Sequence, residues 1–445
     1  MSTTALAYHA SATYSSDISD WIPPYSSDVW DPSDMETIYH SFSLPRCLSP
    51  VPTQSREMFT FTISRYERLI EASYFQPAYD QLIRVRQSLS WRSQVSPVAR
   101  WTMFLAAKVF ESLVDSPQLR AAKFIKYYDW SKRFEGEMVS LPLHGLTSAE
   151  LQNRLSERLE VALFKLRTTD SINTYQLLRN HASVFHQIVS SDPAFWSDTY
   201  CRPTRVSLAH VLALPRYEIA HFALLDMMCS MAYGLPQVID YDTSTPPLET
   251  NFYPVEWIHG CPVDFQIIIA KINSLCNWDQ IGPPPDWRPL ERELRDWQPD
   301  VFKVTEEESW KAVARLAVRE SWRHALLIYM YMAVCGVASD DPRVSSSVKQ
   351  VFQIICTVKH QPQPVTNLHF STQYLVAGAY TPNEKQRAIA REQLSVSVKF
   401  GSWLLNGSDL LPVLDHLWHG AAANGRPIRW RDYVHSRQVA LPIPI

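Results

Sequence analysis

Residues Ser309–Ala338 read SWKAVARLAVRESWRHALLIYMYMAVCGVA, and this stretch decides the fold of the chain. Its first half places Trp310, Ala314 and Ala317 at helical spacing, which predicts one apolar face. From Ala325 the polar face disappears, as is typical of a helix that is buried on every side. This apolar run has 14 residues, fewer than the roughly 20 needed to cross a bilayer. We therefore predict that the whole stretch is the longest helix of a soluble core.

A basic stripe follows the polar face of the same helix. Lys311, Arg315, Arg319 and Arg323 lie four residues apart, so their side chains share one face. Such a stripe either points into solvent or bonds loop carbonyls, or it binds an acidic or phosphorylated ligand. We favour the first interpretation, because spacing alone does not direct the stripe at a ligand.

The composition of the chain indicates a globular, all-α protein. Its 445 residues are 46% hydrophobic with a net charge of −3, so there is no overall attraction to nucleic acid. Only 11 glycines are present, and no confident strand pattern is visible. The periodicity predicts a single large, irregular helical domain of about 14–16 helices. This domain is expected over residues 57–445.

Residues 1–56 are predicted to form a disordered tail that is rich in Ser, Thr and Pro. The tail has six acidic and two basic residues, a difference of −4, and its aromatic residues are interleaved with the acids. This composition suits a segment that folds on a partner, as activation segments do, or an unconstrained linker. We favour the linker.

The sequence offers no catalytic motif and no metal-ligand cluster. None of the seven cysteines lies within four residues of another, so zinc-binding spacings are missing. Scattered cysteines without a signal peptide are typical of reduced thiols in an intracellular protein. We therefore predict no enzyme activity and name no catalytic, metal-binding or DNA-contacting residue.

Three short segments carry weaker chemical signals. His259 and Cys261 are close enough to share a metal, but no third ligand neighbours them, so a turn before a helix is favoured. Asp340 and Asp341 resemble the magnesium motif of all-helical terpene synthases, but a proline follows and no second acidic motif exists. A helix-ending turn is the better explanation. The basic, aromatic segment 425–437 could grip nucleic acid, but a surface capping segment is favoured.

A methionine-rich helix is predicted over residues 216–233, within the segment LPRYEIAHFALLDMMCSMAYGLP (214–236). Methionines of this kind usually pack in a core, although they can also line a malleable pocket. If an effector site exists, we expect it where this helix, the turn at 255–261 and the central helix meet. The candidate pocket residues are Met227, Met228, Met231, Trp257, His259 and Trp322.

Four segments taken together resemble the fungal-specific transcription factor domain, in the version found in basidiomycete proteins named for a zinc binuclear cluster. The segments are 214–236, EWIHGCP (256–262), RLAVRESWRHALLIYMYMAVCGVASDDPRV (315–344) and LWHGAAANGRPIRWRDYVHSR (417–437). The resemblance covers roughly residues 57–440. The family-motif residues expected to be structural are Pro215, Arg216, Tyr217, Glu218, Arg319, Glu320, Trp322 and Arg323.

The resemblance implies a nuclear, all-α regulatory domain that usually follows a six-cysteine zinc cluster. That cluster binds DNA, and the domain acts through dimer contacts or a small effector. Here the cluster is missing, because Cys47 is the first cysteine and Cys201 the next. We expect either that the cluster was lost or that the gene model omits its exon. No zinc or DNA-contact residue is therefore carried over, and no cofactor is expected unless an upstream cluster exists.

The expected function is that of a transcription-regulator-like domain without its own DNA reader. Its expected partners are proteins of the transcription machinery, a second copy of the chain or a small effector, with no direct contact to nucleic acid or membrane. An all-helical interaction scaffold unrelated to transcription is the alternative. A cryptic prenyl-diphosphate enzyme that uses Asp340 is the less favoured third hypothesis.

Overall fold

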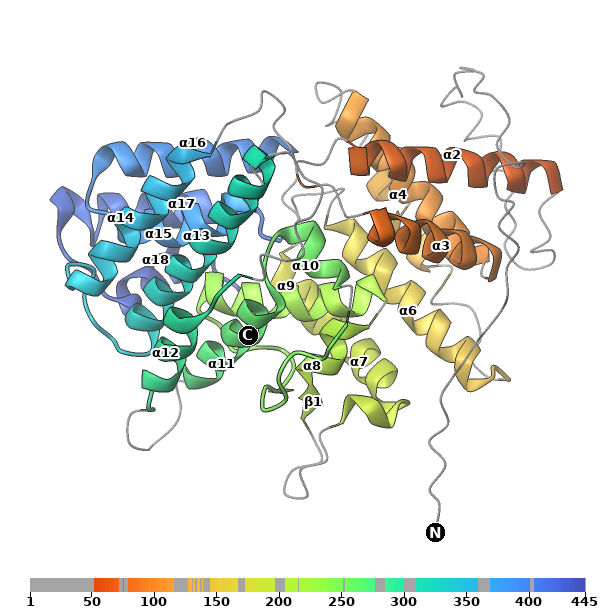
Figure 1. Cartoon of the computed structure of the whole chain (residues 1–445), viewed down its shortest axis with the longest axis horizontal. Helices are drawn as coiled ribbons and strands as arrows, with labels where there is room; N and C mark the ends of the chain where they lie inside the picture. Colours follow the sequence, from red (N-terminus) through yellow and green to blue (C-terminus); the bar gives the residue numbers. More distant parts are fainter. Residues whose placement is uncertain are drawn as a thin grey trace, which may run out of the picture. The chain divides into compact units, whose positions relative to one another are not determined.

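Sixteen α-helices and two short strands make up the part of the chain that the computed structural model describes (Figure 1). The all-α prediction is therefore confirmed. The described residues are 52–71, 75, 79–95, 97–115, 127–129, 131–132, 134–136, 138, 145–166, 173–196, 205–214, 216–250, 253–276, 285–299, 309–358, 369–400 and 404–444. The elements before residue 260 are α2 (Pro52–Glu71), α3 (Tyr79–Val95), α4 (Pro97–Asp115), α6 (Ser148–Lys165), α7 (Thr174–Ser190), β1 (Val206–Ser207), α8 (Leu208–Ala213), α9 (Tyr217–Tyr233), β2 (Tyr241–Asp242) and α10 (Pro254–His259). The later helices are α11 (Val263–Leu275), α12 (Arg288–Asp296), α13 (Ser309–Ala333), α14 (Pro342–Thr357), α15 (Ser371–Tyr380), α16 (Glu384–Phe400), α17 (Gly407–His419) and α18 (Trp430–Ala440).

Residues 50–445 form one compact unit. The predicted tail lies outside the described residues as far as residue 51, and α2 begins at Pro52, before the predicted start at residue 57. Within the described residues, no helix combines the length and the apolar character that crossing a membrane requires.

The central helix α13 is shorter than the sequence predicts. It ends at Ala333 rather than Ala338, because the backbone N–H groups of Val334 and Cys335 both donate to the carbonyl of Met330, at 2.9 and 3.1 Å. Gly336 then adopts a φ of +64°, which turns the chain away from the helix axis.

The pair Asp341–Pro342 begins a helix instead of ending one. Pro342 is the first residue of α14, and the Asp341 carboxylate accepts the backbone N–H of Arg343 at 2.9 Å as an N-cap. The Arg343 guanidinium donates to both oxygens of the same carboxylate. These bonds lower the pKa of Asp341. The helix-ending interpretation was therefore wrong. Proline fits the first turn of a helix, because a backbone N–H at that position would have no partner within the helix.

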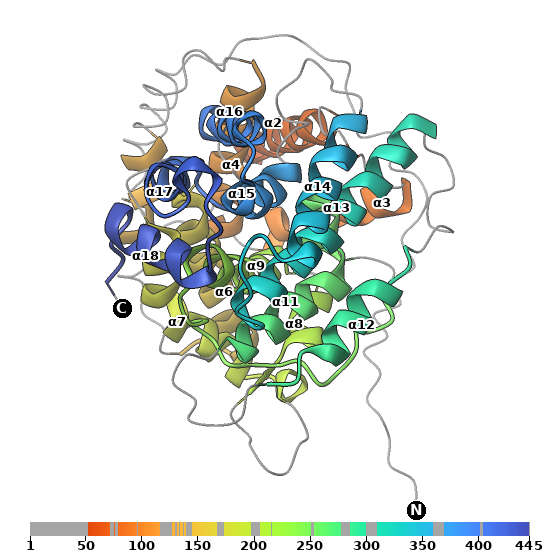
Figure 2. The same ribbon diagram turned by 90° about the vertical axis from the view of Figure 1, so that its left-hand side faces the viewer.

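Helices α9 and α15 and the second half of α13 form the centre of the core. Every residue from 218 to 233 and from 372 to 380 is buried, as is the run 325–332 of α13. Helix α13 packs against α11, α12, α14 and α15 (Figure 2). Helix α9 packs against α6, α7, α8, α10 and α11. Because the core helices are apolar all round, their backbone and few polar groups must find partners inside the protein.

Helices α2, α3 and α4 pack on one another and reach the other helices mainly through α6. In Figure 1 they lie together, in orange tones, beside α6. Leu105, Val109 and Phe110 of α4 join Phe164 of α6 in a small hydrophobic cluster of their own. This contact, with an ion pair between Arg92 and Glu160, attaches the first helices to the core.

The two strands are the one departure from helix among the described elements. Each has two residues, and they pair in parallel with Val206 opposite Tyr241. A strand this short has no alternating pattern, so the sequence could not reveal it.

The buried carboxylate of Asp226 holds the loop that leads into β2. Its two oxygens accept the backbone N–H groups of Val238 and Ile239 at 2.7 and 3.0 Å. Burial raises the pKa of Asp226 to about 7, although both hydrogen bonds favour the ionised form. The segment between α9 and β2 is thus anchored to the middle of α9.

We expect Asp226→Asn to destabilise the chain by about 1–3 kcal/mol, because the amide NH₂ would face a backbone N–H donor and leave it unpaired. The measurement is urea unfolding at pH 8, above the pKa of Asp226. The matched control is Asp240→Asn, since Asp240 is exposed and forms only a surface ion pair with Arg205. An equal loss of stability in both variants would show that Asp226 does not anchor the loop.

Candidate functional site

Tyr217 and His221 of α9 meet His259 at the end of α10, and we call these three residues the histidine stack. The Tyr217 hydroxyl lies 3.3 Å from Nδ1 of His221 and 3.4 Å from Nε2 of His259. The two histidine nitrogens are 3.2 Å apart, and their rings lie 5.1 Å apart and nearly parallel. Both histidines are buried. The stack therefore links two helices by polar contacts inside the core.

The turn after α10, residues 259–262, is the point where the stack approaches the central helix. Gly260 has a φ of +64°, which strongly favours glycine. A Cβ atom at this position would lie 3.2 Å from Val318 Cγ1 of α13 and 3.3 Å from Nδ1 of His369. The turn predicted from His259 and Cys261 is confirmed, since α10 ends at His259 and α11 begins two residues after Cys261.

His369 completes the polar surroundings of this turn. Its ring hydrogen-bonds to the backbone of His259, and it packs against Phe75 with ring centroids 4.9 Å apart. Burial lowers the pKa of His369 to about 4, against the smaller opposing effect of the His259 hydrogen bond. The imidazole is therefore neutral at physiological pH.

The family-motif residues at the start of α9 connect this helix to α6. The Ser156 hydroxyl donates to the carboxylate of Glu218, and both residues are buried. The Arg216 guanidinium donates to the side-chain oxygens of Gln152 and Asn153, at 3.4 and 3.2 Å. Pro215 lies outside the described residues. Arg216 and Glu218 thus have structural contacts, in keeping with the role that the resemblance implies.

The basic stripe of α13 makes contacts within the protein. Arg319 forms an ion pair with Glu256 of α10 at 3.5 Å, and Arg315 lies over the ring of Phe75 at 4.8 Å. Arg323 donates to the backbone carbonyl of Arg295 at 3.1 Å. These contacts favour the structural interpretation of the stripe over a ligand-binding face.

Glu320 balances part of this positive charge. It forms an ion pair with Arg323 and a hydrogen bond with His324 on its own helix. Burial alone would raise the pKa of Glu320. The hydrogen bonds from His324 and Arg323 outweigh burial, so the pKa of Glu320 is lowered. The charged family-motif residues of α13, which are Arg319, Glu320 and Arg323, therefore make structural contacts at the surface of this helix.

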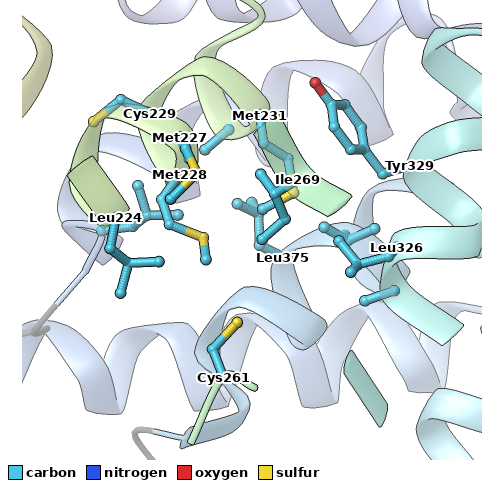
Figure 3. Close-up of a cluster of buried hydrophobic side chains, with 14 of the residues drawn as sticks. Leu224, Met227, Met228, Cys229, Met231, Cys261, Ile269, Leu326, Tyr329 and Leu375 are labelled. Carbon is cyan, nitrogen blue, oxygen red and sulfur yellow. The ribbon is translucent and has the colours of Figure 1, made fainter. Parts of the chain in front are cut away.

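The methionines of the predicted pocket lie in the apolar core. Met227, Met228 and Met231 are at most 2% exposed. Figure 3 shows them near Ile269 of α11, Leu326 of α13 and Leu375 of α15. Their positions are those of core packing, the favoured interpretation.

The other predicted pocket residues are placed as follows. His259 belongs to the histidine stack, and Trp322 is buried on α13, one turn beyond the Val318 that contacts the α10 turn. The side chain of Trp257 lies outside the described residues. Sequence reasoning missed His221 and His369. The spacing of Tyr217 and His221 by four residues is the one signal that could have indicated a polar contact.

The three buried thiols of the core have raised pKa values. Burial raises the pKa of Cys276 to about 12 and also raises the pKa of Cys229 and Cys261. These thiols are therefore protonated and unreactive at physiological pH. Among the described residues, no three His, Cys, Asp or Glu side chains converge as metal ligands.

Residues 183–441 match the family model described as the fungal specific transcription factor domain. The matched range includes the histidine stack, the α10 turn and the whole of α13, and it begins within α7. Residues 57–182, where the resemblance was also expected, lie outside the match. No curated protein and no solved structure matches the chain.

The low pKa of His369 predicts that stability falls in mild acid. The unfolded histidine has a pKa of about 6.5, so between this value and about 4 the unfolded chain binds more protons. The stabilisation by neutral His369 is thus complete above about pH 6.5 and declines as the pH falls. We expect this group to account for a loss of about 2 kcal/mol between pH 7 and 5.

The measurement is urea unfolding at both pH values, for the wild type and for His369→Asn, which keeps an N–H donor but does not titrate. The variant should lose less stability than the wild type between pH 7 and 5. His435→Asn, at an exposed position on α18, is the control. If His369→Asn retained the full pH dependence of the wild type, His369 would not be the group responsible.

Proposed function

Because the chain belongs to the fungal-specific transcription factor domain family, we propose that it regulates transcription through contacts with other proteins or with a small effector. The proposed partners are proteins of the transcription machinery or a second copy of the chain. We place its action in the nucleus, and the proposal requires no zinc or other cofactor in the described helices.

The observation that carries the proposal is the family match over residues 183–441, which includes every described helix from α8 to α18. The family is one of transcription factor regulatory domains and not an enzyme family. Asp341, one of the two acids that resemble the magnesium motif, is engaged by the backbone N–H and the guanidinium of Arg343.

The basic segment 425–437 also supports action through proteins rather than through direct contact with nucleic acid. Arg426 and Arg437 donate to the backbone carbonyls of Gly420 and Tyr233, at 2.8 and 2.7 Å. Guanidinium groups engaged in this way satisfy the carbonyls at helix ends. Helix α18 therefore serves as a capping element on the core, as favoured from the sequence.

The test is a reporter experiment in a fungal cell. The full chain is fused to a DNA-binding module of unrelated origin, and expression is measured from a gene that carries the binding sites of that module. We expect the fusion to change expression relative to the module alone.

Leu326→Asp in the fusion should abolish this change, because it buries an unpaired charge in the core. Gln353→Asp, at an exposed position on α14, should retain it. A fusion that is expressed and folded but leaves the reporter unchanged would overturn the proposal. Localisation outside the nucleus, with cytoplasmic proteins as the main binding partners, would instead favour a scaffold unrelated to transcription.

A further inference from the structure

Helices α2 and α4 are tied to each other by charged and aromatic contacts. Arg65 of α2 forms an ion pair with Glu111 of α4 at 2.8 Å, and the rings of Phe61 and Phe104 lie 5.3 Å apart. The ammonium group of Lys108 on α4 lies 4.2 Å from the centre of the Phe61 ring. Because these contacts join side chains of both helices, α2 and α4 support each other directly.

Helix α3 completes this group, and α4 lies at its centre. Arg86 of α3 forms an ion pair with Glu67 of α2 at 2.9 Å. Every residue from 102 to 110 of α4 is buried, whereas α2 and α3 each bury only two of the side chains that the structure describes. Helices α2 and α3 therefore shield α4 from solvent. We call the three helices, together with Phe75 between α2 and α3, the cover.

The described contacts between the cover and the rest of the domain centre on α6 and on Phe75. Phe164 of α6 joins the small hydrophobic cluster of α4, and Arg92 of α3 forms an ion pair with Glu160 of α6. Among the described residues, Phe75 is the one side chain of the cover that belongs to the main hydrophobic core. The cover thus has its own hydrophobic cluster and inserts a single aromatic side chain into the larger one.

Phe75 contacts two groups of the core at once. It is only 3% exposed. Its ring lies 4.9 Å from that of His369 and 4.8 Å from the guanidinium of Arg315 on α13. Both of these residues lie within the family match at 183–441, whereas Phe75 lies outside it. One side chain from outside the matched range therefore covers part of the basic stripe of α13.

This distribution of contacts favours separate opening of the cover. Proteins open locally in contiguous units that have few contacts with their surroundings, and such units have a lower opening free energy than the whole fold. Release of the cover would break the contacts of Phe164, Glu160 and Phe75. The contacts within the cover and the main hydrophobic core would persist. Opening therefore requires less free energy than global unfolding.

We infer that the cover opens as one unit while the core stays folded, and that Phe75 is the latch that holds it closed over Arg315 and His369. Both of these residues are half-buried in the closed state. They face solvent in the open state, so opening controls access to this part of α13. The inference concerns the folding of the chain and does not depend on the proposed function.

The first test breaks the contact with α6 and measures the opening at His369. Histidines of the full chain are labelled with diethylpyrocarbonate and quantified by mass spectrometry. Glu160→Gln weakens the ion pair with Arg92 and should speed the labelling of His369 about tenfold, because the labelling rate follows the open population when opening is rapid. Labelling of His221, which is buried in the core, and of the exposed His435 should stay unchanged.

The second test breaks the latch and measures the opening at α4. Phe75→Leu keeps an apolar side chain but removes the ring that contacts His369 and Arg315. Hydrogen exchange of the α4 amides should be about tenfold faster, because α4 loses the support of Phe164 when the cover opens, and exchange of the α11 amides should not change. Arg84→Gln, at an exposed position on α3, is the control and should affect neither measurement. Circular dichroism verifies that each variant is folded.

The inference fails if Glu160→Gln leaves the labelling of His369 unchanged, since the cover would then not open as one unit. It also fails if His369 and His221 gain reactivity together, because the whole domain would then unfold in one step. Faster exchange in Phe75→Leu that is confined to the neighbours of this residue, with α4 unaffected, would show that Phe75 is not a latch.

Discussion

The close approach at Gly260 is the constraint on which the centre of the structure depends. Any side chain at this position would press on Val318 and on His369, and a φ of +64° strains every residue except glycine. Because the turn comes this near to α13, His259 can reach His221 on one side, and the carbonyl of Cys261 can reach Gln266 on the other. Two polar clusters of the core therefore share one turn.

The rest of the fold follows from the apolar nature of its central helices. A helix that is buried on every side has no solvent to satisfy its ends, so the carbonyls there need donors from elsewhere. Helix α18 supplies them for α9, since the Tyr433 hydroxyl and the Arg437 guanidinium donate to the carbonyls of Ala232 and Tyr233. Asp226 has the complementary role in the loop that follows α9, because its carboxylate accepts the backbone N–H groups of Val238 and Ile239. The polar residues of the core are thus connections between elements that are distant in sequence.

Sequence patterns were sufficient where the determining contacts are local. The capping box of Thr147 and Glu150 begins α6, and Gly234 ends α9 in the left-handed conformation, and both are local signals that can be read from the sequence. The end of α13 was placed too late, because hydrophobicity continues through Cys335 although the backbone has already turned. The convergence of His259 with His221 was not predictable, since the two residues are 38 positions apart and no local rule brings them together. The same holds for Gln373 and Ser321, which are 52 positions apart.

The α10 turn connects the buried core with the surface of α13. His259 lies only two residues before the Cys261 carbonyl that Gln266 binds, and Gly260 between them is in contact with α13. Cores at native packing density transmit displacement instead of absorbing it. A displacement of this turn would therefore act on the histidine stack, and through Glu256 of α10 on the ion pair with Arg319 at the α13 surface. One rigid turn thus connects the buried histidines with the surface of α13.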